Sequence, residues 1–336
     1  MKIDYLDKFK GTLIGIAIGD TLGKPFNGKT RTEIISQFEN FETFFMKKKR
    51  KVFKTYSDNT QLMLHVAEAL IQGNGFNMNF LIRELIRWLD DPPKGEAFSC
   101  ISAIRKLKGN IPWEQASTNS GGSGTLARAV PFALIYHEEI DTLKDVVELA
   151  SSITHSHPAA SGSAIVFSRG IAYLIKKIPE QDFLLDEFFD VLVESISDSK
   201  NKAWNDLISH LQEISKNLDL SVEAGLIKLS QIGVSPVYYL QEYLGKAFIH
   251  PYAISTIICS LFLFVKQLDS FKDFIFTIGT AGGGATAAAV GGGLAGAFHG
   301  YSKIPQELVK LVNKSNYILD VAERLYEVYK KRERIK

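Results

Sequence analysis

The sequence has little cysteine, almost no net charge and no apolar leader, and each shortage excludes a class of protein. Only two of its 336 residues are cysteines, Cys100 and Cys259, and they lie far apart in apolar surroundings, which excludes a disulfide scaffold and a cysteine-built zinc site. A net charge of +2 gives no overall field to hold nucleic acid or an anionic membrane. The first residues, MKIDY, are charged, unlike a secretory signal. We therefore expect a cytoplasmic protein with neither nucleic-acid nor membrane partners.

Strand signals are also scarce, and no hairpin dipeptide separates two alternating runs. Apolar residues instead recur at helical spacing, with prolines near the expected helix boundaries. No linker divides the chain, so the pattern predicts an all-α fold, a single compact helical domain over residues 1–336 that ends in a C-terminal helix within 306–336. The predicted helices are Leu62–Ile71, Phe80–Leu89, Ala127–His137, Leu143–Ile153, Ser161–Ile178, Phe183–Ser197, Ala203–Leu218, Ser221–Ile232, Ile254–Leu268 and Asn316–Lys331.

One long segment, Phe274–Ser302, carries no Asp, Glu, Lys or Arg and could span a bilayer by length. Its two Gly-Gly-Gly runs weaken that interpretation, because each glycine costs about 1 kcal/mol relative to alanine in a helix. We expect a buried central helix, entered through a glycine turn and packed closely on its neighbours. A basic run, residues 47–51, is expected to be a solvated loop, since the balanced composition gives it no basic company.

Five clusters of small and polar residues stand at expected helix ends. Each helix N-terminus carries about half a positive charge, and glycine-rich loops expose backbone N–H groups that hold phosphates. Together the clusters predict one pocket for a phosphorylated or otherwise anionic ligand. The clusters are Gly15–Asn27, Tyr56–Gln61, Asn119–Arg128, Thr154–Pro158 and Ala281–Thr286.

Taken one at a time, the clusters have simpler interpretations. Asp58 can serve as the N-cap of a helix, with Gln61 in the reciprocal capping position, or the same oxygens can ligate Mg²⁺. The first cluster can be a packed helix followed by a turn. His155 and His157 are as readily structural as functional.

In this order the clusters resemble the ADP-ribosylglycohydrolase family, which includes ADP-ribosylarginine hydrolases and the dinitrogenase-reductase-activating glycohydrolase. The resemblance runs from about Phe9 to Pro305 and implies a compact helical fold with an ADP-ribose cleft that usually holds two Mg²⁺ ions. The similar segments are GIAIGDTLGKP (family GxAxGDALGxP), YSDNTQ (YTDDTQ), FSCISAI (TCLSAL), GSGTLAR (GCGGxMR), THSHP (THxHP) and GGGAT…LAGA (GDTDT…LAGA).

The departures from the family pattern fall on its metal ligands. Asn27 replaces a Glu, Asn59 replaces the second Asp of TDDT, and Gly283 and Ala285 replace the two aspartates of GDTDT. Only Ser57, Asp58 and Thr286 remain at ligand positions. Because Mg²⁺ is anchored by carboxylates in octahedral sites, we expect no dinuclear Mg²⁺ site and no other cofactor.

The losses balance in charge, since four carboxylates and two divalent cations disappear together. The sequence therefore predicts a metal-free relative that binds ADP-ribose or a related nucleotide, either free or on an ADP-ribosylated protein, and hydrolyses it poorly or not at all. The expected ligand-binding residues are Asp20, Asn27, Ser57, Asn59, Gly122, Ser123, Gly124, Arg128, His155, Gly282, Gly283, Gly284 and Thr286.

Two alternatives stay open at this point. An active hydrolase with altered chemistry would need a general base, for which Asp58 and then His157 are the expected catalytic residues. A structural or partner-binding protein would have kept only the fold.

Overall fold

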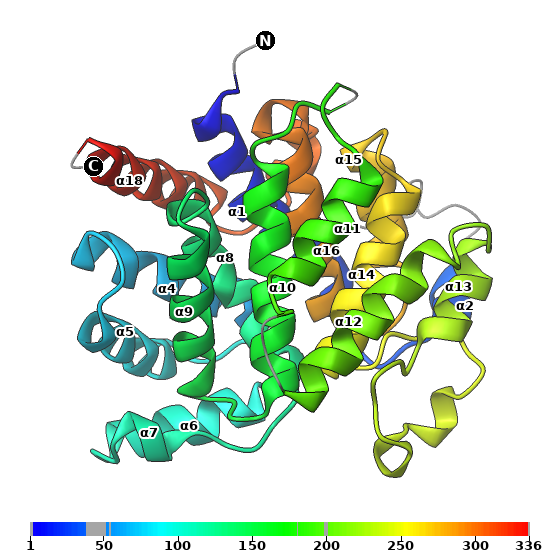
Figure 1. The fold of residues 1–336 in the computed structure, drawn as a ribbon, viewed down its shortest axis with the longest axis horizontal. Helices are drawn as coiled ribbons and strands as arrows, with labels where there is room; N and C mark the ends of the chain where they lie inside the picture. The colour runs from blue at the N-terminus through cyan, green and yellow to red at the C-terminus, as the bar shows by residue number, and fades with distance from the viewer. Residues whose placement is uncertain (1–2, 38–51, 54, 180, 198–200, 335–336) are drawn as a thin grey trace.

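The computed structural model describes residues 3–37, 52–53, 55–179, 181–197 and 201–334. Within these ranges the regular structure is helical, and extended pairing is limited to three isolated β-bridges, which confirms the all-α fold (Figure 1). The longer helices are α1 (Tyr5–Gly23), α4 (Asp58–Gly73), α5 (Met78–Asp90), α6 (Phe98–Lys108), α8 (Leu126–Ile135), α9 (Ile140–Ser152), α10 (Pro158–Leu174), α11 (Leu185–Glu194), α12 (Lys202–Ser215), α13 (Val222–Leu229), α14 (Ala253–Lys266), α15 (Phe271–Gly279), α16 (Ala285–His299) and α18 (Ser315–Glu333). Short elements are α2 (Arg31–Ile35), α7 (Trp113–Ala116), α17 (Gln306–Val309), η1 (Lys24–Phe26), η2 (Ser123–Thr125), η3 (Pro236–Tyr238), η4 (Gln241–Tyr243) and η5 (Tyr301–Lys303).

The centre of the molecule is the pair α1 and α16, whose backbones touch because both carry glycines at the contact (Figure 1). A Cβ on Gly19 would lie 1.9 Å from the carbonyl oxygen of Ala288, and one on Gly15 would lie 2.3 Å from that of Gly292. This confirms the buried central helix expected in Phe274–Ser302, entered through a glycine turn. No helix in the described part of the chain is long and apolar enough to cross a membrane.

Other helices enclose this pair. α10 packs on α8, α9 and α16, and α14 and α15 pack on α16. α18, drawn in red in Figure 1, lies against α1, α4 and α8 and buries Ile318, Val321 and Leu325. The predicted C-terminal segment is thus α17 followed by α18.

The observed helix ends differ by a few residues from those predicted by the apolar periodicity, because capping residues determine where a helix begins. α10 begins at Pro158, three residues before the predicted start, because His157 caps it and proline fits the first turn. α13 ends at Leu229, short of the predicted Ile232. The basic run at 47–51 lies outside the described residues.

Candidate functional site

Asp20, in the last turn of α1, holds the start of α4 in place. Its carboxylate is fully buried and accepts four hydrogen bonds: from Ser57 Oγ (2.6 Å) and N (3.0 Å), and from Thr60 Oγ1 (2.6 Å) and N (3.0 Å). Burial raises the pKa of Asp20, and these donors oppose the rise. We expected Asp20 to bind ligand, but both of its carboxylate oxygens accept hydrogen bonds that join α1 to α4.

The cap of α4 is Ser57 and not Asp58, which corrects the capping arrangement expected from the sequence. Ser57 Oγ accepts from the N–H of Asn59 at 3.2 Å, and Asp58 is the first helical residue. Gln61 does not close a capping box either, because its amide bonds to the carbonyl of Pro92 (3.2 Å) and the N–H of Lys94 (2.8 Å). The side chain of Asp58 is thus left for other contacts.

Asp58 is a partly buried carboxylate with a perturbed acidity. Burial, followed by the charge of Asp20, raises its pKa to about 6, while Lys24 opposes the shift. Its side chain packs on Gly95, where a Cβ would come within 1.6 Å of Oδ1. A carboxyl that titrates near neutrality can hold or release a proton at physiological pH.

Two asparagines link α4 and η1 to the start of α16. Asn59 Nδ2 donates to Ser57 Oγ (3.0 Å) and to Thr286 Oγ1 (3.2 Å). Asn27 Oδ1 accepts from the N–H of Ala285 at 2.8 Å. The structure therefore brings Ser57, Asn59 and Thr286 together through side-chain hydrogen bonds, and holds Asn27 beside them through the backbone of Ala285.

The glycine turn before α16 has a backbone that other residues rarely adopt. Gly282, Gly283 and Gly284 have φ values of +92°, +85° and +96°. A Cβ on Gly283 would lie 2.3 Å from the carbonyl oxygen of Ile249. The N–H of Gly283 donates to the carbonyl of Lys29 at 3.1 Å. The turn is therefore held between the backbone of Lys29 and that of Ile249.

In the second glycine loop, residues 121–124, backbone N–H groups also donate hydrogen bonds to other groups of the protein. The N–H of Gly122 donates to Ser120 Oγ (3.2 Å) and that of Ser123 to the carbonyl of Pro251 (3.1 Å). A Cβ on Gly124 would lie 3.3 Å from His155 Cε1. Several N–H groups that we expected to hold phosphate thus already have acceptors.

Arg128 and His155 lie behind this loop. The Arg128 guanidinium is buried, donates to Thr154 Oγ1 and to the carbonyl of Ala150 (3.4 Å), and lines a small cavity of about 10 Å³. His155 Nδ1 pairs with Thr154 Oγ1 at 2.7 Å. Burial, followed by the charge of Arg128, lowers the pKa of His155 to about 3, so its ring is neutral at physiological pH.

His157 is placed as a cap. Its Nδ1 accepts from the N–H of Ala159 at 3.1 Å, and its ring contacts that of Tyr252 at 6.2 Å between centroids. A neutral imidazole that accepts at Nδ1 carries its proton on Nε2, which leaves no lone pair for base catalysis. The geometry therefore favours Asp58 over His157 as the acid or base of this region.

Sequence reasoning missed three residues that shape the site. Cys100 is fully buried, packs 3.4 Å from the position of a Cβ on Gly124, and lies near both Asp58 and Arg128. Lys24 Nζ donates to the carbonyl of Tyr56 at 3.0 Å. Cys100 and Lys24 lie inside segments that resemble the family's motifs, so these motifs could have indicated them. The third residue, Gly95, packs on Asp58 and lies outside every such segment.

The match to known proteins covers the whole chain. A model of the ADP-ribosylglycohydrolase family matches residues 1–335. The chain belongs to the ADP-ribosylglycohydrolase family. It is 21% identical over 347 residues to the ADP-ribosylhydrolase ARH3 of Xenopus tropicalis, with 97% of each chain covered. It is 22% identical to the ADP-ribosylarginine hydrolase Tri1 of Serratia proteamaculans, covering 96% of this chain and 80% of that protein.

A solved ADP-ribosylglycohydrolase-related protein complex shares the fold, with a TM-score of 0.72 and 21% identity over 97% of this chain and 99% of that one. This member of the ADP-ribosylglycohydrolase family has few acidic groups at the junction of α4 and α16. Among the residues that the structure describes, no group of three or more His, Cys, Asp or Glu side chains converges as a metal site would require.

Proposed function

We propose that this ADP-ribosylglycohydrolase family member binds ADP-ribose or a related nucleotide without two Mg²⁺ ions and hydrolyses it poorly or not at all. The ligand could be free or carried on an ADP-ribosylated protein. Both cysteines are free and buried, which supports our further proposal of a cytoplasmic location.

The observation that carries this proposal is the pair of asparagine links. At the positions of the family's metal ligands, Asn27 accepts from Ala285 and Asn59 donates to Thr286 and Ser57. Mg²⁺ is anchored by carboxylates, whereas the amide oxygens of Asn27 and Asn59 are uncharged, and that of Asn27 already accepts from the N–H of Ala285. The one carboxylate, Asp58, cannot anchor two ions, so the residues present do not fit the family's metal pair.

The balance of charge supports a retained anion site. Removing four carboxylates and two divalent cations changes the local charge little, and the N-termini of α4, α10 and α16 keep their partial positive charge. An anionic nucleotide can then be attracted without metal. Fewer backbone N–H groups are available than the glycine content suggests, which favours modest affinity.

Isothermal titration of ADP-ribose in Mg²⁺ and in EDTA tests the proposal. We expect equal dissociation constants in both buffers and no release of ADP-ribose from modified arginine or serine peptides. Binding that requires Mg²⁺ would contradict the metal-free site. Absence of heat and of any thermal shift in either buffer would support a protein that kept only the fold.

A second candidate, an active hydrolase, is favoured by one observation, the pKa of Asp58 of about 6. Such a carboxyl could accept a proton from water or donate one to a leaving group. Turnover that is abolished in Asp58→Asn and independent of EDTA would establish this candidate over the binding protein.

A further inference from the structure

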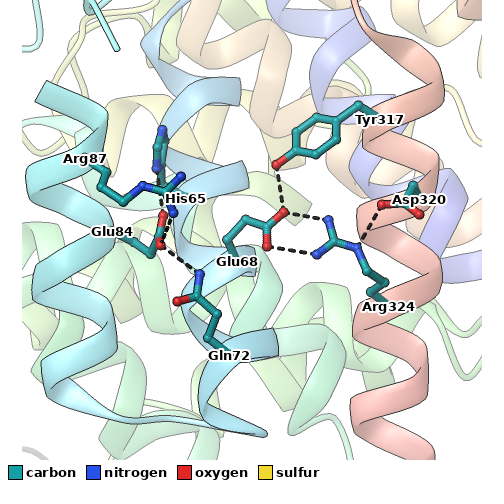
Figure 2. Close-up of polar contacts among 8 residues, drawn as sticks. All are labelled: His65, Glu68, Gln72, Glu84, Arg87, Tyr317, Asp320 and Arg324. Carbon is teal, nitrogen blue, oxygen red and sulfur yellow. Dashed lines mark hydrogen bonds and ion pairs between the residues drawn. The ribbon is translucent and has the colours of Figure 1, made fainter. Parts of the chain in front are cut away.

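A polar pocket of about 450 Å³ lies between α4, α5 and α18 (Figure 2). Its volume falls in the range of about 300–1,000 Å³ that ligand pockets occupy. Nothing in the proposed function uses it. Its chemistry is set by charged and ring side chains from these helices and their ends, namely His65, Glu68, Glu84, Arg87, Asp91 and Lys314.

The inner wall of the pocket carries Glu84, a carboxylate with 1% of its side chain exposed. Glu84 accepts from Arg87 Nη1 (2.6 Å) and Gln72 Nε2 (2.8 Å), and pairs with His65 Nδ1 at 3.2 Å. Burial lowers the pKa of His65, so the ring is neutral at pH 7 and donates from Nδ1. The charge of Glu84 is therefore balanced by Arg87 alone.

On another wall of the pocket, the charge of Glu68 is likewise balanced by an arginine. Glu68 is held by two hydrogen bonds from Arg324 (2.6 and 2.9 Å) and one from the hydroxyl of Tyr317 (2.7 Å), as Figure 2 shows. This bidentate pair ties α4 to α18 and gives the pocket a fixed shape. It adds no net charge.

Two charges remain without such pairing. Within the part of the chain that the structure describes, neither the Asp91 carboxylate nor the Lys314 ammonium makes a side-chain hydrogen bond or ion pair, yet both line the pocket. Asp91 lies close enough to raise the pKa values of His65 and Lys94, and Lys314 close enough to lower that of Lys94. The Nζ of Lys94 lies 4.2 Å from the ring centroid of Tyr56, at the edge of the pocket. The pocket therefore presents separate anionic and cationic groups, Asp91 on one element and Lys314 on another.

We propose that this pocket binds a small zwitterion, a molecule of amino-acid size with one ammonium and one carboxylate group. The ammonium pairs with Asp91, and the carboxylate pairs with Lys314 and the outward N–H groups of Arg87, whose side chain is 63% exposed. A ligand with a single charge would satisfy one of these groups and leave the other unpaired. Complementary charges on two different elements thus favour the zwitterion.

The site is distinct from the one proposed for ADP-ribose. Tyr56 and Gln61 form the shared wall, because both line this pocket and both belong to the cluster Tyr56–Gln61. The amide of Gln61 also bonds to the backbone of Pro92 and Lys94. Failure of either proposal would leave the other standing, since the two ligands contact different residues.

Calorimetric titration with simple probes tests the inference. Glycine, 4-aminobutanoate and 6-aminohexanoate carry the two charges at increasing separation, whereas butylamine and butanoate carry one each. We expect at least one zwitterion to bind about tenfold more tightly than both single-charge probes, as the loss of one charged hydrogen bond implies. If no zwitterion exceeds the single-charge probes, the proposal is wrong.

Two exposed positions allow matched variants that keep the fold. Asp91→Asn preserves shape, and Lys314→Asn suits the left-handed backbone at Lys314, where φ is +57°. Each is expected to weaken the preferred zwitterion about tenfold, whereas Lys310→Ala, an exposed lysine outside the pocket, leaves its affinity unchanged. Unchanged affinity in both asparagine variants, or an equal loss in the Lys310 control, would overturn the assignment.

Discussion

Asp20, in the last turn of α1, and Asp58, the first residue of α4, both lie at the start of α4 in space but differ in their hydrogen bonding. Asp20 receives four hydrogen bonds in a fully buried position. Partial burial raises the pKa of Asp58 to about 6, and the compensation from Lys24 is weaker. The first carboxylate stabilises the junction of α1 and α4, and the second is the group of the pair whose pKa lies near neutrality.

Replacing Asp20 by alanine is expected to lower the free energy of unfolding by about 3–5 kcal/mol, because buried donors of Ser57 and Thr60 lose their acceptor. Urea denaturation followed by circular dichroism measures the change. Asp145→Ala, at an exposed aspartate of α9, is the control and should change stability by less than about 0.5 kcal/mol. A loss of similar size in both variants would show that Asp20 is no anchor.

Asp58→Asn is expected to flatten the dependence of stability on pH. The folded-state pKa of about 6 lies above the ordinary value of 3.8, so the folded chain binds this proton more tightly and gains stability as pH falls from 6 toward 4. Above pH 6 the buried charge costs about 2–3 kcal/mol, which the amide avoids. The variant should therefore be the more stable protein at pH 8 and equal to the wild type near pH 4, in denaturation curves at both values. Parallel curves at every pH would contradict the shifted pKa.

For single residues, the sequence could predict which ones lie close together at the site but not which hydrogen bonds each one makes. Asn27, Asn59 and Thr286 come together as the motifs predict. The role of Arg128 could not be read from its place after a glycine loop, because only tertiary packing turns its guanidinium toward Thr154.

The close contact of α1 with α16 is the main feature at the level of elements. Composition predicted the second helix and its burial, whereas the first was expected only as the packed helix of the cluster Gly15–Asn27. They could not predict that the partner is α1, because the contact joins segments more than 260 residues apart along the chain. The glycines of both helices, considered together, are the signal that was available.

Gly19→Ala is expected to destabilise the protein by about 3 kcal/mol or more, because the new methyl group would meet the backbone of Ala288, which cannot move aside. Gly170→Ala is the matched control within α10. Its Cβ would have ordinary contacts of 3.4 Å or more, so helix propensity should stabilise the variant by about 0.5–1 kcal/mol. Thermal unfolding of both proteins measures the pair, and a Gly19→Ala protein as stable as the wild type would refute the close approach.

At the scale of the whole molecule, the core that holds the family's fold is separate from the residues of the candidate site. The core is continuous through α1, α10, α14 and α16, and the site residues lie at helix ends that this core fixes. The sequence predicted that the polar clusters converge, since helix ends are where unpaired backbone groups collect. It could not show that many of those groups are already bonded within the protein, because such pairing depends on long-range contacts such as Gly283 with Lys29.

Chelation is therefore expected to leave the stability of the whole protein unchanged. A ligand present at one hundred times its dissociation constant raises the free energy of unfolding by about 3 kcal/mol. Removal of two resident Mg²⁺ ions would therefore lower the melting temperature by several degrees. Because Asn59 and Asn27 make these links directly, we expect no such ion to contribute. Calorimetric melting temperatures in EDTA and in Mg²⁺ should agree within about 1 °C, with recovery on adding Mg²⁺ back as the control. A reversible fall in EDTA would mean that a metal, and not the two amides, joins α4 to α16.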